Sequence, residues 1–184
     1  MGYHMPSMLS GPALNEELAR AEKELGFELN DALKELYRCA NGITRDYETA
    51  SGLTGILPIH DFLSLTDAVT HYQELIDLEE SFTDFGTGFK PGKSLFPFLD
   101  DGAGNCYWVD LNTGTANENR IYWTNTFGQD PCYHYEFLQN MFAVIAEAYE
   151  KDIFSLDEDG YLDADYSAFH ELSGKYNQEV EYWK

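Results

Sequence analysis

A histidine and a glutamate stand at the H-x-E spacing of zinc deaminases in the segment from Cys132 to Glu136. In those enzymes the histidine binds zinc, the glutamate transfers protons, and a P-C-x-x-C segment further along the chain supplies the other ligands. Here Pro131 and Cys132 precede His134, and no cysteine follows it. The other histidines are scattered singly: His4, His60, His71 and His170. We therefore expect surface or capping histidines and no metal site.

An acidic stretch, Asp157-Glu158-Asp159-Gly160, suggests a different chemistry, the binding of calcium. An EF-hand loop needs acidic residues at its first, third and fifth positions, glycine at the sixth and glutamate at the twelfth. When Asp157 takes the first position, Gly160 falls at the fourth and Leu162 at the sixth, so the register fails. We interpret the stretch as an acidic turn between helices.

The motifs of nucleophilic catalysis and phosphate binding are absent from the sequence, which has no G-x-S-x-G, P-loop or G-x-G-x-x-G. The run from Asp101 to Asn105 has the glycine spacing of a phosphate-binding nest, but it leads into a strand rather than a helix. Asp100 and Asp101 are the kind of pair that performs acid–base chemistry, although adjacent carboxylates at a turn usually face water. We expect that the protein is not an enzyme and that it binds no cofactor. A cation-dependent enzyme built on the acidic loops is an alternative that a calcium- or zinc-dependent melting temperature would reveal.

Extended segments surround these residues. Two strand-like runs, Ser94–Leu99 and Cys106–Leu111, flank the turn at 100–105, and a further run follows at Arg120–Thr124. Aromatic and β-branched residues favour extended backbone, and the short turns between consecutive runs predict an antiparallel meander. An additional strand is expected at Leu53–Leu57, before Pro58.

Apolar residues at helical spacing predict helices on both sides of these strands. Asn15, Asn30 and Thr66 are the expected N-caps of three helices in the first half of the chain. A long apolar helix is expected over 137–149 and a weaker, tyrosine-rich one over 165–173. The predicted fold class is α+β, a single domain in which N-terminal helices and a long C-terminal helix pack around a mainly antiparallel sheet.

The charge balance is strongly acidic, with 11 Lys and Arg against 33 Asp and Glu and a formal net charge of −22. A field of this sign repels nucleic acids and anionic membranes, and it speeds the encounter with basic proteins. Solubility, or life in a salty cytoplasm, is the alternative explanation of the charge. Thirteen tyrosines exceed what a core of this size requires, so we expect some at the surface as interface anchors.

The three cysteines show no C-x-x-C spacing, which predicts reduced thiols and a cytoplasmic location. The sequence has no apolar window long enough for a membrane span and no secretory signal pattern. Residues 1–12 lack periodicity, and we expect them to be flexible or artificially added. The sequence leaves the choice between monomer and homodimer open.

Three stretches carry a family resemblance: residues 24–42, which close on Asn-Gly; residues 57–66; and residues 95–111, with a D-G-x-G-[DN] turn. In this order and spacing they resemble the SUKH superfamily, which unites yeast cell-wall-synthesis regulators with many bacterial immunity proteins. The resemblance implies a domain over 14–152, on which an acidic, tyrosine-rich extension at 153–184 packs. Leu29-Asn30 departs from the family's Leu-Pro, but asparagine caps a helix equally well, so the expected fold stands.

The resemblance implies a non-catalytic protein that binds and neutralises a bacterial toxin domain, often a nuclease. A nuclease needs Lys and Arg to hold its substrate, so the cognate toxin would offer a basic surface to this acidic chain. An intracellular scaffold or regulatory adaptor, like the yeast members, is the alternative.

The expected contact residues are the carboxylates of the two acidic turns and two tyrosines: Asp100, Asp101, Tyr133, Tyr135, Asp157, Glu158 and Asp159. Gly102, Gly104 and Asn105 match the family's turn motif. We expect these three residues to shape the hairpin rather than to contact the toxin.

Overall fold

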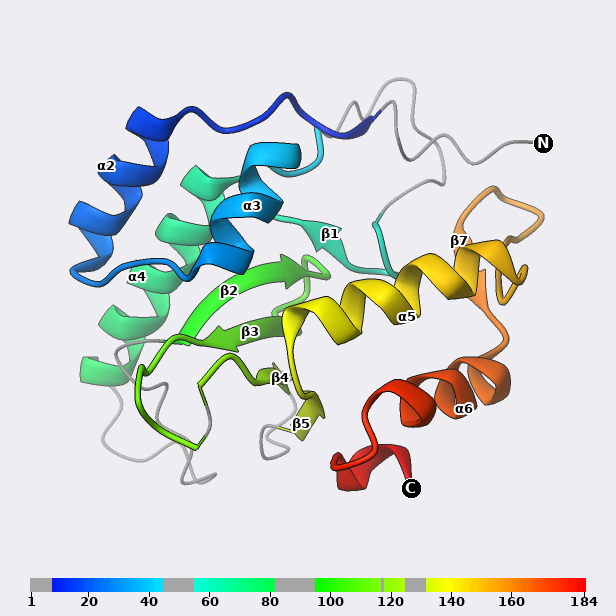
Figure 1. Cartoon of the computed structure of the whole chain (residues 1–184). Helices are drawn as coiled ribbons and strands as arrows, with labels where there is room; N and C mark the ends of the chain where they lie inside the picture. Colours follow the sequence, from blue (N-terminus) through cyan, green and yellow to red (C-terminus); the bar gives the residue numbers. More distant parts are fainter. Residues whose placement is uncertain (1–7, 45–54, 82–94, 117, 125–131) are drawn as a thin grey trace.

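The computed structural model describes residues 8–44, 55–81, 95–116, 118–124 and 132–184. Its centre is an antiparallel five-stranded sheet in the order β1-β2-β3-β4-β5 (Figure 1). These strands are β1 (Asp61–Phe62), β2 (Leu95–Asp100), β3 (Cys106–Asp110), β4 (Ile121–Thr124) and β5 (Cys132–Tyr135). A separate hairpin pairs β6 (Phe154–Leu156) with β7 (Leu162–Ala164). The expected α+β class and antiparallel meander are confirmed.

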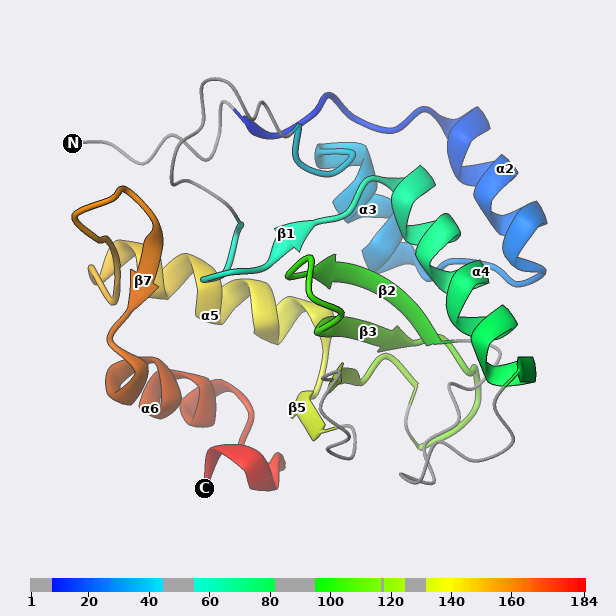
Figure 2. The same ribbon diagram turned by 180° about the vertical axis from the view of Figure 1, so that it is seen from behind.

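The helices are α2 (Asn15–Leu25), α3 (Asp31–Cys39), α4 (Leu65–Ser81), α5 (Leu138–Glu150) and α6 (Tyr166–Tyr176), followed by a 3-10 turn, η1 (Glu181–Trp183). Figures 1 and 2 show α5 across one face of the sheet, α4 beside β2 on the other side, and α6 with η1 beyond β5. Within the described residues, no helix is both long enough and apolar enough to cross a bilayer.

The main core lies between the sheet and the helices that cover it. Tyr37 of α3 packs against the rings of Phe62 and Phe96, with centroids 5.2 and 6.3 Å away. Met141 of α5 is fully buried in the same cluster. Burying side chains of this size stabilises the fold by roughly 1.5–3 kcal/mol each, so the helices are held to the sheet mainly by apolar packing.

Only one of the three predicted N-caps is confirmed. Asn30 caps α3, because its Oδ1 accepts a hydrogen bond from the backbone N–H of Leu33 at 2.8 Å. The prediction of Asn15 was wrong: the cap of α2 is Leu14, whose backbone N–H donates to the Glu17 carboxylate at 2.7 Å. The hydrogen bond from Leu14 to the Glu17 side chain takes the place of a capping side chain, and Asn15 is the first residue of the helix.

The predicted cap of α4 was also wrong, because the helix begins before Thr66. The hydroxyl of Ser64 accepts from the backbone N–H of Asp67 at 3.1 Å. The N–H of Leu65 donates to Asn41 Oδ1 at 2.8 Å, which ties this helix start to the end of α3. The earlier start also buries Leu65, whose side chain is only 3 % exposed.

The expected strand before Pro58 is not formed over its described part, residues 55–57, and residues 53–54 lie outside the described ranges. The chain turns here instead, with Leu57 bridged to His60. Gly55 has φ 97°, and a Cβ on it would lie 2.2 Å from the His60 carbonyl oxygen, so the turn requires glycine. The strand forms later, as β1.

Two further expectations change at the ends of the chain. The acidic stretch at 157–160 connects β6 and β7 rather than two helices. Residues 1–7 of the expected flexible leader lie outside the described ranges, but residues 8–12 run beside 42–44. Ser10 donates its N–H to Gly42 at 2.9 Å, and Thr44 donates to Met8 at 2.8 Å.

Candidate functional site

A pocket of about 280 Å³ lies between the central sheet and the segment that follows α5. Its walls come from the turn at 57–60, from β3 and β5, from the base of the β6–β7 hairpin, and from α6 and η1. The lining is mostly apolar and aromatic, with a few histidines. Such a pocket suits an apolar or aromatic group and offers few polar contacts to orient it.

His134 of β5 is the central polar group of the pocket wall, and it is only 4 % exposed. Its ring is stacked with Trp123, at 5.7 Å between centroids, and with Tyr182, at 4.0 Å. Its Nδ1 lies 3.3 Å from the hydroxyl of Tyr107. Its Nε2 has no hydrogen-bond partner among the described residues. Burial lowers the pKa of His134 to about 3, so the imidazole is neutral. Its Nε2 is therefore a polar atom of the pocket wall that makes no hydrogen bond within the described residues.

His60 holds the 57–60 turn against the sheet. Its Nδ1 lies 3.0 Å from the carbonyl oxygen of Pro58, and its Nε2 accepts from the indole N–H of Trp123 at 3.4 Å. This network assigns the proton to Nδ1. Burial lowers the pKa of His60 despite the nearby carboxylates, so this wall of the pocket is neutral as well.

The rim of the pocket is unusually apolar for a surface. Ile59, Tyr166 and Tyr182 line it and are 62, 65 and 50 % exposed. Ile59 also has φ 62°, a left-handed conformation that strains a β-branched residue. Exposed apolar patches and stored strain both mark sites of interaction, so this rim is the strongest candidate surface for a partner.

The acidic turn belongs to the same neighbourhood. Phe154 and Ala164 pair at the base of the β6–β7 hairpin and line the pocket, and Asp157, Glu158 and Asp159 are exposed at its tip. The carboxylate of Asp157 accepts from the backbone N–H groups of Asp159 and Tyr161, at 2.9 and 2.8 Å. One hairpin therefore carries an acidic tip on a base that lines an aromatic pocket.

The other acidic turn, at 100–105, lies on the sheet side of the pocket. Asp61, which follows His60, pairs with Asp100, and the carboxylates of Asp100 and Asp101 both act on the pKa of His60. The Asp101 carboxylate accepts from the backbone N–H groups of Ala103 and Asn105, at 2.8 and 2.9 Å, and from the Asn105 side chain. Burial raises the pKa of Asp101, but these hydrogen bonds lower it more, and the net shift is downward. Gly102 and Gly104 have φ 74° and 93°, as the tight turn requires.

Asp100 offers little surface to a partner, because it is 8 % exposed. Its Oδ1 accepts from the Gly102 N–H at 2.5 Å, and its Oδ2 accepts from the thiol of Cys106 at 3.0 Å. Both oxygens of this carboxylate are used inside the hairpin, so its role as a contact residue stays a prediction with little exposed surface behind it.

Tyr133 and Tyr135 lie on opposite faces of the sheet, although alternation along a strand would place them on the same face. An irregularity in the β4–β5 pairing, with His134 as the extra residue of β5, pairs Tyr133 with Tyr122 and Tyr135 with Ile121. Tyr133 is half-buried beneath the Arg120 guanidinium, 4.5 Å above its ring. Tyr135 is fully buried in the core, a position that leaves it no surface for a partner, so we do not keep it among the contact residues.

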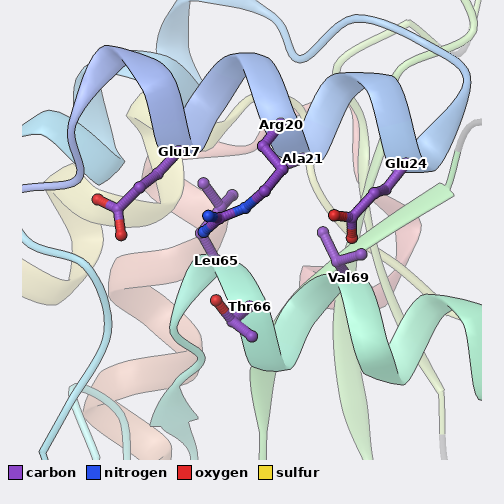
Figure 3. Close-up of a pocket in the computed structure, with 7 residues that line it drawn as sticks. All are labelled: Glu17, Arg20, Ala21, Glu24, Leu65, Thr66 and Val69. Atoms are coloured by element: carbon purple, nitrogen blue, oxygen red, sulfur yellow. The ribbon is translucent and has the colours of Figure 1, made fainter.

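A smaller groove of about 140 Å³ lies between α2 and α4 (Figure 3). Figure 3 shows the guanidinium of Arg20 lying between the carboxylates of Glu17 and Glu24, above Leu65 and Val69. This mixture of charges gives no preference for a cationic partner. We therefore place the candidate site at the first pocket.

The sequence analysis missed His60, Tyr166 and Tyr182 as site residues. The surplus of tyrosines after residue 152 was the available signal, but it named no partner segment. Half of the pocket comes from the 57–60 turn and the sheet, and only the fold brings these next to the extension.

Comparison with known families gives one finding. The model of the SMI1 / KNR4 family (SUKH-1) matches residues 12–147, which run from just before α2 to near the end of α5. A search among curated proteins found no match. The β6–β7 hairpin, α6 and η1 lie beyond the matched region, so one side of the pocket is built outside it.

Proposed function

The chain belongs to the SMI1 / KNR4 family (SUKH-1), and we propose that it is a non-catalytic immunity protein that neutralises a basic, nuclease-type bacterial toxin domain by binding it. The family fits roles in immunity and in cell-wall regulation. The observation that carries the choice is the exposed apolar rim of the aromatic pocket, adjoining the hairpin with the acidic tip.

The two parts of this surface have different physical roles. The net charge of −22 and the tip carboxylates, Asp157 to Asp159, attract a cationic domain and raise its association rate. The pocket then receives an apolar or aromatic side chain of the toxin, and buried anchors of this kind provide most of the affinity of an interface. We expect Asp101 and Tyr133 to add long-range attraction and rim contacts rather than an anchor.

The position of the pocket suggests how the chain selects its partner. Tyr166, Tyr182 and the hairpin lie outside the region that matches the family, whereas His60 and His134 lie within it. In this proposal the part of the pocket within the matched region is common to the family, and the part outside it is particular to this chain. The second part would let the chain recognise one cognate toxin. We place this interaction in the cytoplasm, in agreement with three cysteines that form no disulfide.

The test uses the C-terminal domain of the protein encoded beside this chain. Association and dissociation rates are measured at low and high salt, with the wild type and with Tyr166→Ala/Tyr182→Ala. We expect an association rate that falls as salt rises, and a dissociation constant that the double substitution weakens about tenfold or more. Leu14→Ala removes an exposed apolar side chain at the N-cap of α2 that does not line the pocket, and it should change neither rate.

If the toxin domain binds tightly and the two tyrosine substitutions leave the dissociation constant unchanged, the interface lies away from the pocket and the immunity role stands. Tight binding without salt dependence would remove the electrostatic part of the mechanism. Several weak partners and no tight one would overturn the proposal in favour of the scaffold or adaptor role.

A further inference from the structure

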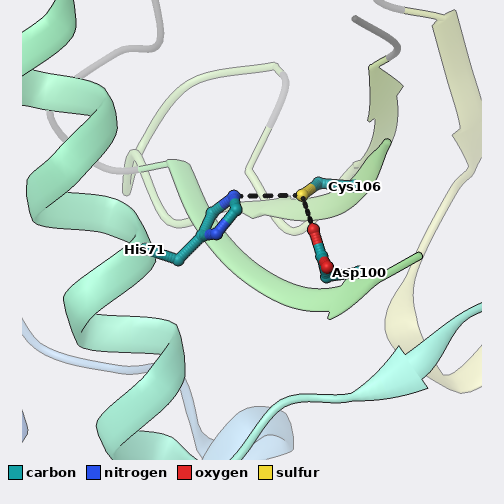
Figure 4. A group of neighbouring side chains, drawn as sticks. All are labelled: His71, Asp100 and Cys106. Atoms are coloured by element: carbon teal, nitrogen blue, oxygen red, sulfur yellow. Dashed lines mark hydrogen bonds between the residues drawn. The ribbon is translucent and has the colours of Figure 1, made fainter. Parts of the chain in front are cut away.

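Three different metal-binding side chains meet on the far side of the sheet from α5. His71 Nε2 lies 3.2 Å from Cys106 Sγ, and Cys106 Sγ lies 3.0 Å from Asp100 Oδ2. The three ligand atoms all lie within 4.8 Å of one another. Figure 4 shows the imidazole and the carboxylate pointing at the sulfur from different directions.

Rigid elements hold these side chains in place. Asp100 ends β2 and Cys106 begins β3, and the two residues pair directly across the hairpin. His71 reaches them from α4, and its ring also packs on Trp108, at 5.9 Å between centroids. The Gly102 N–H fixes the other oxygen of the Asp100 carboxylate at 2.5 Å, as outer hydrogen bonds orient the ligands of metal sites.

The burial of this cluster is costly without a cation. Asp100 is 8 % exposed and Cys106 is 1 % exposed, while His71 is half-buried. Among the described residues, no lysine or arginine forms an ion pair with Asp100. A buried carboxylate is stabilised far better by a cation than by a neutral thiol. The thiol of Cys106 donates its hydrogen bond to Asp100 Oδ2 at 3.0 Å, so a neutral donor stands where a cation would neutralise the carboxylate.

We propose that His71, Asp100 and Cys106 bind one Zn²⁺ ion through Nε2, one carboxylate oxygen and the thiolate, with water in the fourth position. The thiol proton leaves to solvent as the sulfur–zinc bond forms. Zinc accepts this mixture of nitrogen, oxygen and sulfur donors in a tetrahedron, whereas calcium and magnesium require oxygen ligands.

The distances are close to those that zinc needs. Tetrahedral zinc, with bonds of about 2.0 Å to nitrogen and 2.3 Å to sulfur, places neighbouring donors roughly 3.5 Å apart. The observed separations of 3.0 and 3.2 Å would open by a few tenths of an ångström, within the reach of side-chain rotation. The ion would connect α4 to the β2–β3 hairpin, which gives it a structural role separate from the partner surface.

The sequence analysis predicted no metal site, and the spacing explains why. The cysteine lies 6 residues from the aspartate but 35 from the histidine, which is no known zinc signature. Only the packing of α4 on the hairpin brings the third ligand into place.

The experiment uses Co²⁺ as a spectroscopic substitute for zinc. The full chain with Cys39→Ser/Cys132→Ser keeps Cys106 as its only thiol. After treatment with EDTA, it is titrated with Co²⁺ and then with Zn²⁺. We expect one equivalent of Co²⁺ to give tetrahedral bands and a thiolate charge-transfer band, both displaced by Zn²⁺. Zinc at about 100 times its dissociation constant should raise the melting temperature by roughly 5–10 °C.

His71→Ala, Asp100→Asn and Cys106→Ser are then made in the same background. Each should weaken metal binding about tenfold or more, and Cys106→Ser should abolish the charge-transfer band. Because Cys106 is buried, circular dichroism of each metal-free variant first establishes that it folds, and half-buried His71 provides the variant least dependent on packing. The absence of a charge-transfer band in the background protein, or unchanged affinity in folded His71→Ala, would overturn the proposal.

Discussion

The indole N–H of Trp183 donates a hydrogen bond to the backbone carbonyl of His134, so the last turn of the chain is attached to an edge strand of the central sheet. Two further bonds act nearby: Glu136 N–H donates to Asn177 Oδ1, and Glu179 N–H donates to the Glu136 carboxylate, both at 3.0 Å. These contacts cover β5, whose free edge would otherwise be open to other chains. They also close the pocket, since Trp183 is part of its wall.

Trp183→Phe should lower the free energy of unfolding by about 1 kcal/mol, because it removes the indole hydrogen bond and keeps an aromatic ring. Urea denaturation measures the change. Tyr161→Phe alters an exposed tyrosine on the β6–β7 hairpin and serves as the control, with no expected effect. Equal stability of the two variants would show that the bond to His134 does not hold the extension.

The acidic tip should act on the rate of encounter. Replacing Asp157, Glu158 and Asp159 by Asn, Gln and Asn should lower the association rate with a cationic toxin domain about three- to tenfold at low salt. Folding should be preserved, since asparagine keeps the oxygen that accepts from the N–H groups of Asp159 and Tyr161.

The matched control for this substitution removes three exposed charges elsewhere, with Glu24→Gln, Glu28→Gln and Asp31→Asn around α2 and α3. Stopped-flow kinetics compares the two proteins at equal net charge. A similar slowing in both would mean that total charge, rather than the hairpin tip, steers the toxin.

Replacing Ile59 should raise the stability of the fold and weaken the binding of the toxin domain. Ile59→Gly relieves a β-branched residue at φ 62° and should stabilise the fold by about 1 kcal/mol, while loss of the rim side chain weakens toxin binding. Asp152 also has a positive φ, 54°, but does not line the pocket. Asp152→Gly should therefore leave affinity unchanged. Thermal unfolding and titration calorimetry check both effects, and a loss of stability in Ile59→Gly would refute the strain argument.

Local signals explain which parts of the fold could be predicted. The β2–β3 hairpin follows from two glycines between aromatic runs, and α5 from a broad apolar stripe, and both appear in the structure. β1 and β5 were missed because they are two and four residues long and form mainly through pairing with neighbours. Such strands carry little pattern of their own.

The candidate site could be predicted only in part, for reasons visible in individual residues. The exposure of Asp157 to Asp159 could be predicted, because runs of charged residues normally face water. The burial of Tyr135 could not be predicted, because it follows from an irregularity in the β4–β5 pairing that puts Tyr133 and Tyr135 opposite consecutive residues of β4. His134 was considered only for metal binding, and its stacking with Tyr182 depends on a contact between distant segments.

His134 should make stability depend on pH. Its folded pKa, lowered by burial to about 3, lies below the unfolded value of about 6.5, so between these values the unfolded chain binds a proton that the folded chain does not. Stability therefore falls as pH falls, by about 2 kcal/mol from this residue between pH 7 and pH 5. His60, which packs on Tyr107 nearby and whose pKa is also lowered, acts in the same direction.

His134→Phe should remove most of this loss of stability, as measured by urea denaturation at pH 7, 6 and 5. It can be less stable than the wild type at pH 7, because only the slope tests the argument. Parallel slopes in the two proteins would mean that His134 takes up its proton in the folded state.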